Sequence, residues 1–124
     1  MKATILLVDD ESIIRKMMSI GLKQFGYNVI EAGGGEQALR LYKENDIDLV
    51  VLDILMPGMC GRKCFSRLIE YDRRAKVIAF TGVRRSSLEE IGFLDIITKP
   101  APLSVFIEQI RAGIAAAAPE DFFS

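Results

Sequence analysis

Short apolar runs alternate with longer segments of helical period along the 124 residues of this chain. The runs are rich in β-branched residues, which is typical of strands buried on both faces, and they cover residues 4–8, 28–31, 49–52, 76–80 and 95–97. Between them, apolar residues recur at spacings of three and four, which indicates amphipathic helices. Because parallel neighbours need crossover helices, this alternation predicts an α/β fold: a five-stranded, doubly wound parallel sheet between two layers of helices, about five helices in all.

Length and charge set further bounds. A chain of this size forms one domain with a sizeable core, and we expect that domain at residues 1–118 and a short tail at 119–124, where Pro119 stops the last helix. Sixteen basic residues nearly balance seventeen acidic ones, so the chain has no overall electrostatic field that would attract nucleic acid or an anionic membrane. No apolar stretch is long enough to span a bilayer. Cys60 and Cys64 predict no disulfide framework, so we expect a reduced, cytoplasmic protein.

Charged and hydroxyl side chains follow four of the five expected strands. Asp9 and Asp10 follow the first strand, Asp53 the third, Thr81 the fourth and Lys99 the fifth. In such sheets, ligands gather at the carboxyl ends of the strands. Three carboxylates repel one another without a counterion, and their oxygens suit Mg²⁺, while a lysine and a hydroxyl bind the oxygens of an anion. The set predicts a phosphate-handling site, although Asp9 and Asp10 alone would also suit a helix cap.

The order of these residues resembles the response-regulator receiver domains of two-component signalling. The resemblance covers essentially the whole chain and rests on Asp9-Asp10, Asp53 with Met56-Pro57-Gly58 and Gly61, Thr81, and Lys99-Pro100. It implies a flavodoxin-like, three-layer α/β/α fold and a stand-alone regulator similar to those of chemotaxis. It also implies a cis peptide bond between Lys99 and Pro100.

The resemblance further implies a role for each site residue. Asp53 would accept a phosphoryl group from a phosphohistidine on a histidine kinase or phosphotransfer protein. Thr81 would hydrogen-bond that group and move towards it on activation, and Lys99 would pair with one of its oxygens. The implied Mg²⁺ ligands are Asp9, acting mainly through water, Asp10, Asp53 and the backbone carbonyl of Leu55.

A protein of this kind is a switch and not an enzyme in the usual sense, because it catalyses only its own phosphorylation and dephosphorylation. We expect it to bind an unidentified downstream protein, and to be a monomer or a weak dimer. Two alternatives stay open. A Mg²⁺-dependent hydrolase of small phosphates would use the same aspartate, but Leu55 stands where an acid would serve the leaving group. A scaffold that docks without being phosphorylated would keep only the fold.

Several positions depart from the family pattern. Ile96 stands where family members usually carry an aromatic residue whose rotamer follows the threonine, and we hypothesise that Phe93 replaces that aromatic residue. Only seventeen residues separate the threonine from the lysine, which predicts a shortened fourth helix around residues 86–91. Leu55 and Val83 cannot position an attacking water by hydrogen bonding, so we predict slow self-dephosphorylation.

Overall fold

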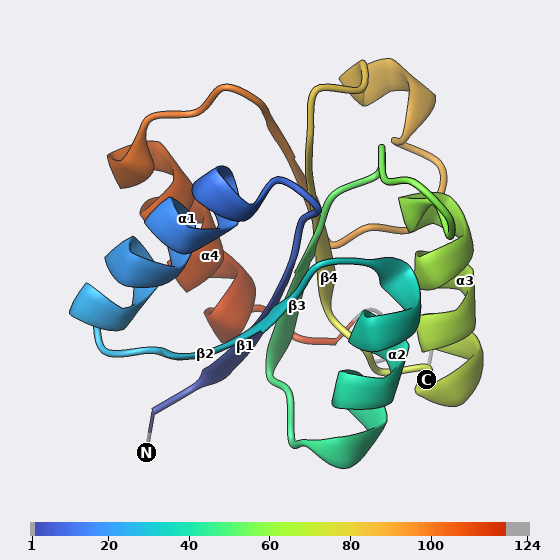
Figure 1. Ribbon diagram of the computed structural model, residues 1–124, viewed down its shortest axis with the longest axis horizontal. Coiled ribbons are helices and arrows are strands. Elements are labelled where there is room, and N and C mark those ends of the chain that lie inside the picture. Colours follow the sequence, from blue (N-terminus) through green and yellow to red (C-terminus); the bar gives the residue numbers. More distant parts are fainter. Residues whose placement is uncertain (1, 119–124) are drawn as a thin grey trace.

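The computed structural model describes residues 2–118, and it confirms the expected alternation of strands and helices. The elements, in chain order, are β1 (Thr4–Val8), α1 (Ser12–Gln24), β2 (Asn28–Ala32), α2 (Gly35–Glu44), β3 (Leu49–Leu52), α3 (Gly61–Tyr71), β4 (Val77–Thr81), a 3₁₀ turn η1 (Arg85–Ser87), β5 (Asp95–Thr98) and α4 (Leu103–Ala115) (Figure 1). Each strand lies within one residue of its expected bounds. The expected tail at 119–124, including Pro119, lies outside the described residues.

All five strands are parallel and follow the order β2-β1-β3-β4-β5. The last residues of neighbouring strands lie close to one another in register. Val8 of β1 is opposite both Ala32 of β2 and Leu52 of β3, and Thr81 of β4 is opposite Thr98 of β5. The carboxyl ends of the strands therefore meet at one edge of the sheet. The strand order changes direction between β1 and β3, and this topological switch point is where a ligand site is expected.

The helices cover both faces of the sheet. The helices α1 and α4 lie on one face, and α2 and α3 lie on the other (Figure 1). Successive side chains of a strand point to opposite faces, so Ile5 and Leu7 pack in the cluster that holds Phe106 of α4, while Leu6 and Val8 pack in the opposite cluster. Burial on both faces explains why the central strands contain almost no polar residues.

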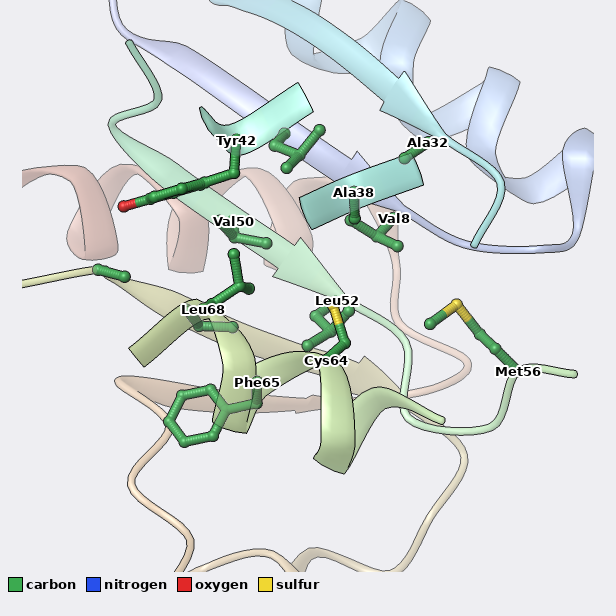
Figure 2. Packing of buried hydrophobic residues seen from close by; sticks show 13 residues of the cluster. Val8, Ala32, Ala38, Tyr42, Val50, Leu52, Met56, Cys64, Phe65 and Leu68 are labelled. Carbon is green, nitrogen blue, oxygen red and sulfur yellow. The ribbon is translucent and has the colours of Figure 1, made fainter. Parts of the chain in front are cut away.

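The cluster beneath α2 and α3 holds β3, the strand that ends next to Asp53. Val50 and Leu52 of β3 meet Ala38 of α2 and Cys64 and Leu68 of α3 (Figure 2). All five side chains are fully buried. Burial raises the pKa of the Cys64 thiol to about 11, so this side chain packs as a small neutral group.

The segment between β4 and β5 differs most from a regular βα unit. It forms the single turn Arg85–Ser87 in place of a helix around residues 86–91, so the described chain has four α-helices where about five were expected. The expected shortening is thereby confirmed. Leu88 is completely buried directly after the turn, and Gly92 adopts a φ of 114° that turns the chain towards β5. No helix within residues 2–118 has the length and apolar character needed to cross a membrane.

Ser19 gives a direct test of the packing of α1. Its hydroxyl is buried and has no hydrogen-bond partner among the described residues. Since an unpaired buried hydroxyl is costly and alanine has the higher helix propensity, we expect Ser19→Ala to raise the free energy of unfolding by about 1 kcal/mol in urea titrations. The control is Ser66→Ala at an exposed position of α3, where only the propensity changes. A Ser19→Ala variant less stable than the parent would contradict this account of the packing.

Candidate functional site

Three carboxylates converge at the carboxyl edge of the sheet, as the sequence predicts. Asp9 and Asp10 follow β1 and Asp53 follows β3, and one carboxylate oxygen from each lies within 4.8 Å of the others. Asp9 and Asp53 are only 2% and 4% exposed, whereas Asp10 faces solvent. A positive charge beside two nearly buried carboxyl groups at this spacing favours their charged forms.

Lys99 supplies one positive charge to this cluster. Its ammonium nitrogen lies 2.7 Å from Oδ2 of Asp9 and 3.4 Å from Oδ2 of Asp53, and it sits above the ring of Phe80 at 5.1 Å from the centroid. Burial alone lowers the pKa of this lysine, but the two carboxylates outweigh burial and raise it. Lys99 is therefore held as a cation at the site. The peptide bond from Lys99 to Pro100 is cis, as expected.

The Asp53 carboxylate occupies a site that opposes its ionisation. Burial is the largest effect and raises the pKa of Asp53, the charge of Asp9 raises it further, and the Lys99 ammonium lowers it only in part. The other Asp53 oxygen, Oδ1, accepts the backbone N–H of Leu55 at 3.2 Å. The backbone N–H of Asp53 donates to the backbone carbonyl of Val8 at 3.0 Å, so Asp53 is hydrogen-bonded to the end of β1. An additional cation next to Asp53 would favour its charged form.

Thr81 reaches the same place from β4. It is completely buried, and its Oγ1 accepts the backbone N–H of Val83 at 3.3 Å. Its hydroxyl also lowers the pKa of Asp53 in part against the effect of burial. Its backbone carbonyl also accepts the N–H of Lys99 at 2.9 Å. All the side chains expected at the site thus come together. Thr81 belongs to the end of β4, although the sequence predicted a strand that ends one residue earlier.

Gly61 fixes the backbone that carries Asp53. It begins α3, and its N–H donates to the Ile54 carbonyl at 2.9 Å. A Cβ at this position would overlap the backbone carbonyl oxygen of Asp53 and lie 2.5 Å from the Cα of Ile54. The absence of a side chain at Gly61 therefore lets α3 pack directly on the loop after β3.

Two further charged residues lie beside the site, of which Arg15 did not emerge from the sequence. Glu11 lies 3.7 Å from the Lys99 ammonium, and Arg15 donates a hydrogen bond to the backbone carbonyl of Asp9. Glu11 occupies the N-cap position of α1, where no side chain forms a capping bond. One Asp9 oxygen does accept the Glu11 N–H at 2.9 Å. Neither Asp9 nor Asp10 therefore caps α1, and the helix-cap alternative is wrong: one Asp9 oxygen closes a local turn before the helix, while the other faces Lys99.

The positions that depart from the family pattern lie around this site. Ile96 is 5% exposed and packs in a small cluster with Leu88, and Phe93 packs against Phe65 of α3 with ring centroids 4.5 Å apart. A relay through Phe93 in place of an aromatic residue at 96 stays a prediction. Leu55 is 64% exposed, and Val83 is partly buried. Neither side chain offers a polar atom to the site.

A parallel α/β sheet that gathers acids, a lysine and a threonine at its carboxyl edge defines a phosphate-handling class of protein. The chain matches the response regulator receiver domain over residues 5–111, and it belongs to that family. It is a phosphoryl-accepting domain of two-component signalling, a family that binds Mg²⁺ through acidic residues and works as a switch. The match does not favour the hydrolase and scaffold alternatives.

Curated relatives agree with this assignment. The chain is 36% identical over 116 residues to the transcriptional regulatory protein YvrH of Bacillus subtilis, which covers 89% of this chain and 48% of YvrH. It is 34% identical over 112 residues to the chemotaxis protein CheY of Bacillus subtilis, which covers 86% of this chain and 93% of CheY. The autoinducer 1 sensor kinase/phosphatase LuxN of Vibrio harveyi matches at 34% identity over 79 residues, or 64% of this chain and 9% of LuxN. The chain thus spans about half the length of YvrH and a small part of LuxN.

Solved structures give the same answer. The response regulator TrrA of Thermotoga maritima, in complex with Mg²⁺ and BeF, has a TM-score of 0.83 and 32% identity, covering 91% of this chain and 99% of TrrA. The CheX–CheY–BeF₃–Mg²⁺ complex of Borrelia burgdorferi has a TM-score of 0.86 and 29% identity, covering 92% of this chain and 90% of the matched chain.

The packing of Gly61 generates a stability prediction. We expect Gly61→Ala to lower the free energy of unfolding by about 1–3 kcal/mol, because the added methyl group forces the backbone at Asp53 and Ile54 to move. The matched control is Gly34→Ala, since Gly34 has extended backbone and nothing lies within 4 Å of its added Cβ. Denaturant titration of both variants measures the difference. Equal stabilities for the two variants would show that α3 has room to shift.

Proposed function

We propose that Asp53 is the phosphoacceptor of this receiver domain. The observation that carries the proposal is the position of its carboxylate, which follows a central strand and lies between two donors. Its Oδ2 lies 3.4 Å from the Lys99 ammonium, and the nearby Thr81 hydroxyl acts on the same carboxyl group, since it lowers the pKa of Asp53 in part against the effect of burial. These donors are placed to bind the oxygens of a phosphoryl group delivered to Asp53.

The proposed reaction is a displacement at phosphorus. A carboxylate oxygen of Asp53 attacks the phosphorus of a phosphohistidine on a histidine kinase or phosphotransfer protein. The P–N bond breaks, its electron pair goes to the imidazole, and an acyl phosphate forms on Asp53. Lys99 and Thr81 bind the phosphoryl oxygens and stabilise their negative charge. The domain, which we place at residues 1–118, would catalyse only this transfer and the later hydrolysis.

The donor set at the site fits Mg²⁺. It consists of carboxylate oxygens from Asp9, Asp10 and Asp53 that lie within 4.8 Å of one another. We propose that Asp10 and Asp53 hold the ion with the backbone carbonyl of Leu55, and that Asp9 acts mainly through water. When bound, the ion supplies positive charge beside the carboxylates and the phosphoryl oxygens. Asp9 also keeps Lys99 in place through their 2.7 Å ion pair.

The test of this proposal is intact-mass measurement after incubation with acetyl phosphate. We expect one phosphoryl adduct on the parent protein in the presence of Mg²⁺, little adduct after chelation, and none on Asp53→Asn. A matched control is Asp46→Asn, which removes an exposed acid from the loop before β3. An adduct of equal yield on Asp53→Asn would place the acceptor elsewhere, and no adduct on the parent would reject the proposal.

An exposed apolar stripe on α1 supports docking of a helical partner beside the acceptor. Ile13, Met17 and Ile20 are 75%, 60% and 58% exposed, and their spacing places them on one face of the helix. Leu103 of α4 packs over Gly21 and extends the stripe. Because α1 begins three residues after Asp9, we propose that a helix of the kinase or phosphotransfer protein docks on this stripe.

Met17→Glu separates docking from chemistry. With a histidine kinase that phosphorylates the parent, we expect phosphotransfer to slow by about tenfold, because a charge replaces a central apolar contact. The rate with acetyl phosphate should stay unchanged. Tyr71→Glu, a similar change at a 55% exposed position on the opposite layer, is the control. Normal kinase-dependent transfer to Met17→Glu would exclude the stripe as the docking surface.

The lifetime of the phosphoryl group is the last consequence of these assignments. Leu55 stands two residues after Asp53 and Val83 two residues after Thr81, and neither side chain can orient a water by hydrogen bonding, so self-dephosphorylation should be slow. We expect the double variant Leu55→Asn, Val83→Glu to shorten the half-life by roughly tenfold or more, because polar side chains can orient an attacking water. Loss of the adduct over time, followed by mass, gives the half-life. An unchanged half-life would show that other groups control hydrolysis.

A further inference from the structure

Arg15 is a partly buried cation whose hydrogen bond to the acidic site goes to the backbone and not to a carboxylate. Its side chain is 16% exposed, and its Nη1 donates to the backbone carbonyl of Asp9 at 2.6 Å. Its Nε donates to Oε1 of Glu31 on β2 at 3.0 Å. The guanidinium of Arg15 therefore links the turn after β1 to β2, the outer strand next to β1.

Two hydrogen bonds hold the two peptide units that meet at the Cα of Asp9, and Arg15 makes the one on the Asp9–Asp10 unit. The N–H of Asp9 donates to the carbonyl of Ala32 at 3.1 Å, and the carbonyl of Asp9 accepts from Arg15. The Asp9 carbonyl belongs to the same planar peptide unit as the nitrogen of Asp10. By holding the Asp9 carbonyl, Arg15 sets the orientation of the Asp9–Asp10 peptide plane. That orientation in turn affects the direction in which the Asp10 side chain leaves the backbone.

Asp10 needs such support more than the other two acids. The Asp9 carboxylate is held by Lys99 and by the N–H of Glu11, and the Asp53 carboxylate by Lys99 and the N–H of Leu55. Asp10 is exposed, and within residues 2–118 no hydrogen bond or ion pair holds its carboxylate. Its oxygen still lies within 4.8 Å of oxygens of Asp9 and Asp53.

We propose that Arg15 is a positioning residue for the divalent-cation site, because it fixes the Asp9–Asp10 peptide and so aims the Asp10 carboxylate at the carboxylates of Asp9 and Asp53. The inference rests on the proposed function, since the ion is the Mg²⁺ of that site. Arg15 touches neither the ion nor the phosphoryl group. An arginine suits the role because two nitrogens of its planar guanidinium donate to Asp9 and to Glu31 at the same time. The ammonium of a lysine is a single nitrogen and does not reproduce this geometry.

Lys16 provides a matched comparison. Its ammonium lies 3.3 Å from the other oxygen of Glu31, but its side chain is 66% exposed, and among the described residues it forms no hydrogen bond or ion pair with the turn after β1. Removing Lys16 takes away one positive charge near Glu31 and leaves the Asp9 carbonyl bonded to Arg15. A general electrostatic effect would appear in both variants, whereas positioning of the peptide would appear only for Arg15.

The experiment is calorimetric titration of the unphosphorylated protein with MgCl₂, for the parent, Arg15→Met, Arg15→Lys and Lys16→Met. Loss of an outer partner of a metal site costs about 10–100-fold in affinity, so we expect Arg15→Met to weaken Mg²⁺ binding at least tenfold. Arg15→Lys should restore part of the affinity, and Lys16→Met should match the parent. With acetyl phosphate, the Mg²⁺ concentration for half-maximal phosphorylation should rise for Arg15→Met, while the rate at saturating Mg²⁺ is retained.

Mg²⁺ affinity of Arg15→Met within twofold of the parent would overturn the inference, even if its thermal stability falls. If Arg15→Met does not fold, Glu31→Gln takes its place, since it weakens the anchor of the guanidinium. We then expect Mg²⁺ binding several-fold weaker than in the parent, and unchanged binding overturns the inference. If the parent protein binds no Mg²⁺, the proposed metal site itself is rejected. If the parent binds Mg²⁺ and is phosphorylated normally while Arg15→Met binds Mg²⁺ equally well, only the role of Arg15 is rejected and the proposed function stands.

Discussion

The balance of charge at the carboxyl edge of the sheet is the constraint on which the site depends. Three carboxylates meet there, and two of them are nearly buried. Within residues 2–118, the ammonium of Lys99 is the one positive charge that pairs with them. Three negative charges against one positive charge leave two negative charges when all groups are ionised. A divalent cation would neutralise this remainder, and in the proposed reaction an incoming phosphoryl group would bring new negative charge for Lys99 and the cation to share. The same imbalance therefore favours both the ion and the reaction.

The rest of the fold keeps these charges in place. Parallel register brings the ends of β1, β3, β4 and β5 to one edge, and apolar packing on both faces holds the strands. Gly61 lets α3 rest on the backbone of Asp53, and Thr81 joins β4 to the loop that continues to η1. Arg85, in that turn, donates to the carbonyl of Ile96 on β5 at 2.7 Å. A change at Thr81 therefore has a short covalent and hydrogen-bonded path to the outer strand.

Much of this arrangement could be predicted from the sequence, because its signals are local. Apolar runs mark the strands, and the residue types that end them reveal the acids, the threonine and the lysine. The single turn at Arg85–Ser87 could be predicted only as a shortening, since the burial of Leu88 depends on tertiary contacts. Arg15 could not be predicted, because an arginine in an amphipathic helix is ordinarily a solvated charge. The one available signal is Glu31, an acid within a strand pattern that requires a basic partner.

The most direct test of the account is a nitrogen-15 NMR titration with Mg²⁺ and beryllofluoride, a mimic of the phosphoryl group. If the carboxyl edge is the phosphoryl site, the largest shifts should occur at the amides of Asp53, Thr81, Val83 and Lys99. They should require Mg²⁺ and disappear in Asp53→Asn. Shifts that persist in that variant, or that gather at the opposite edge of the sheet, would contradict the assignment of this site.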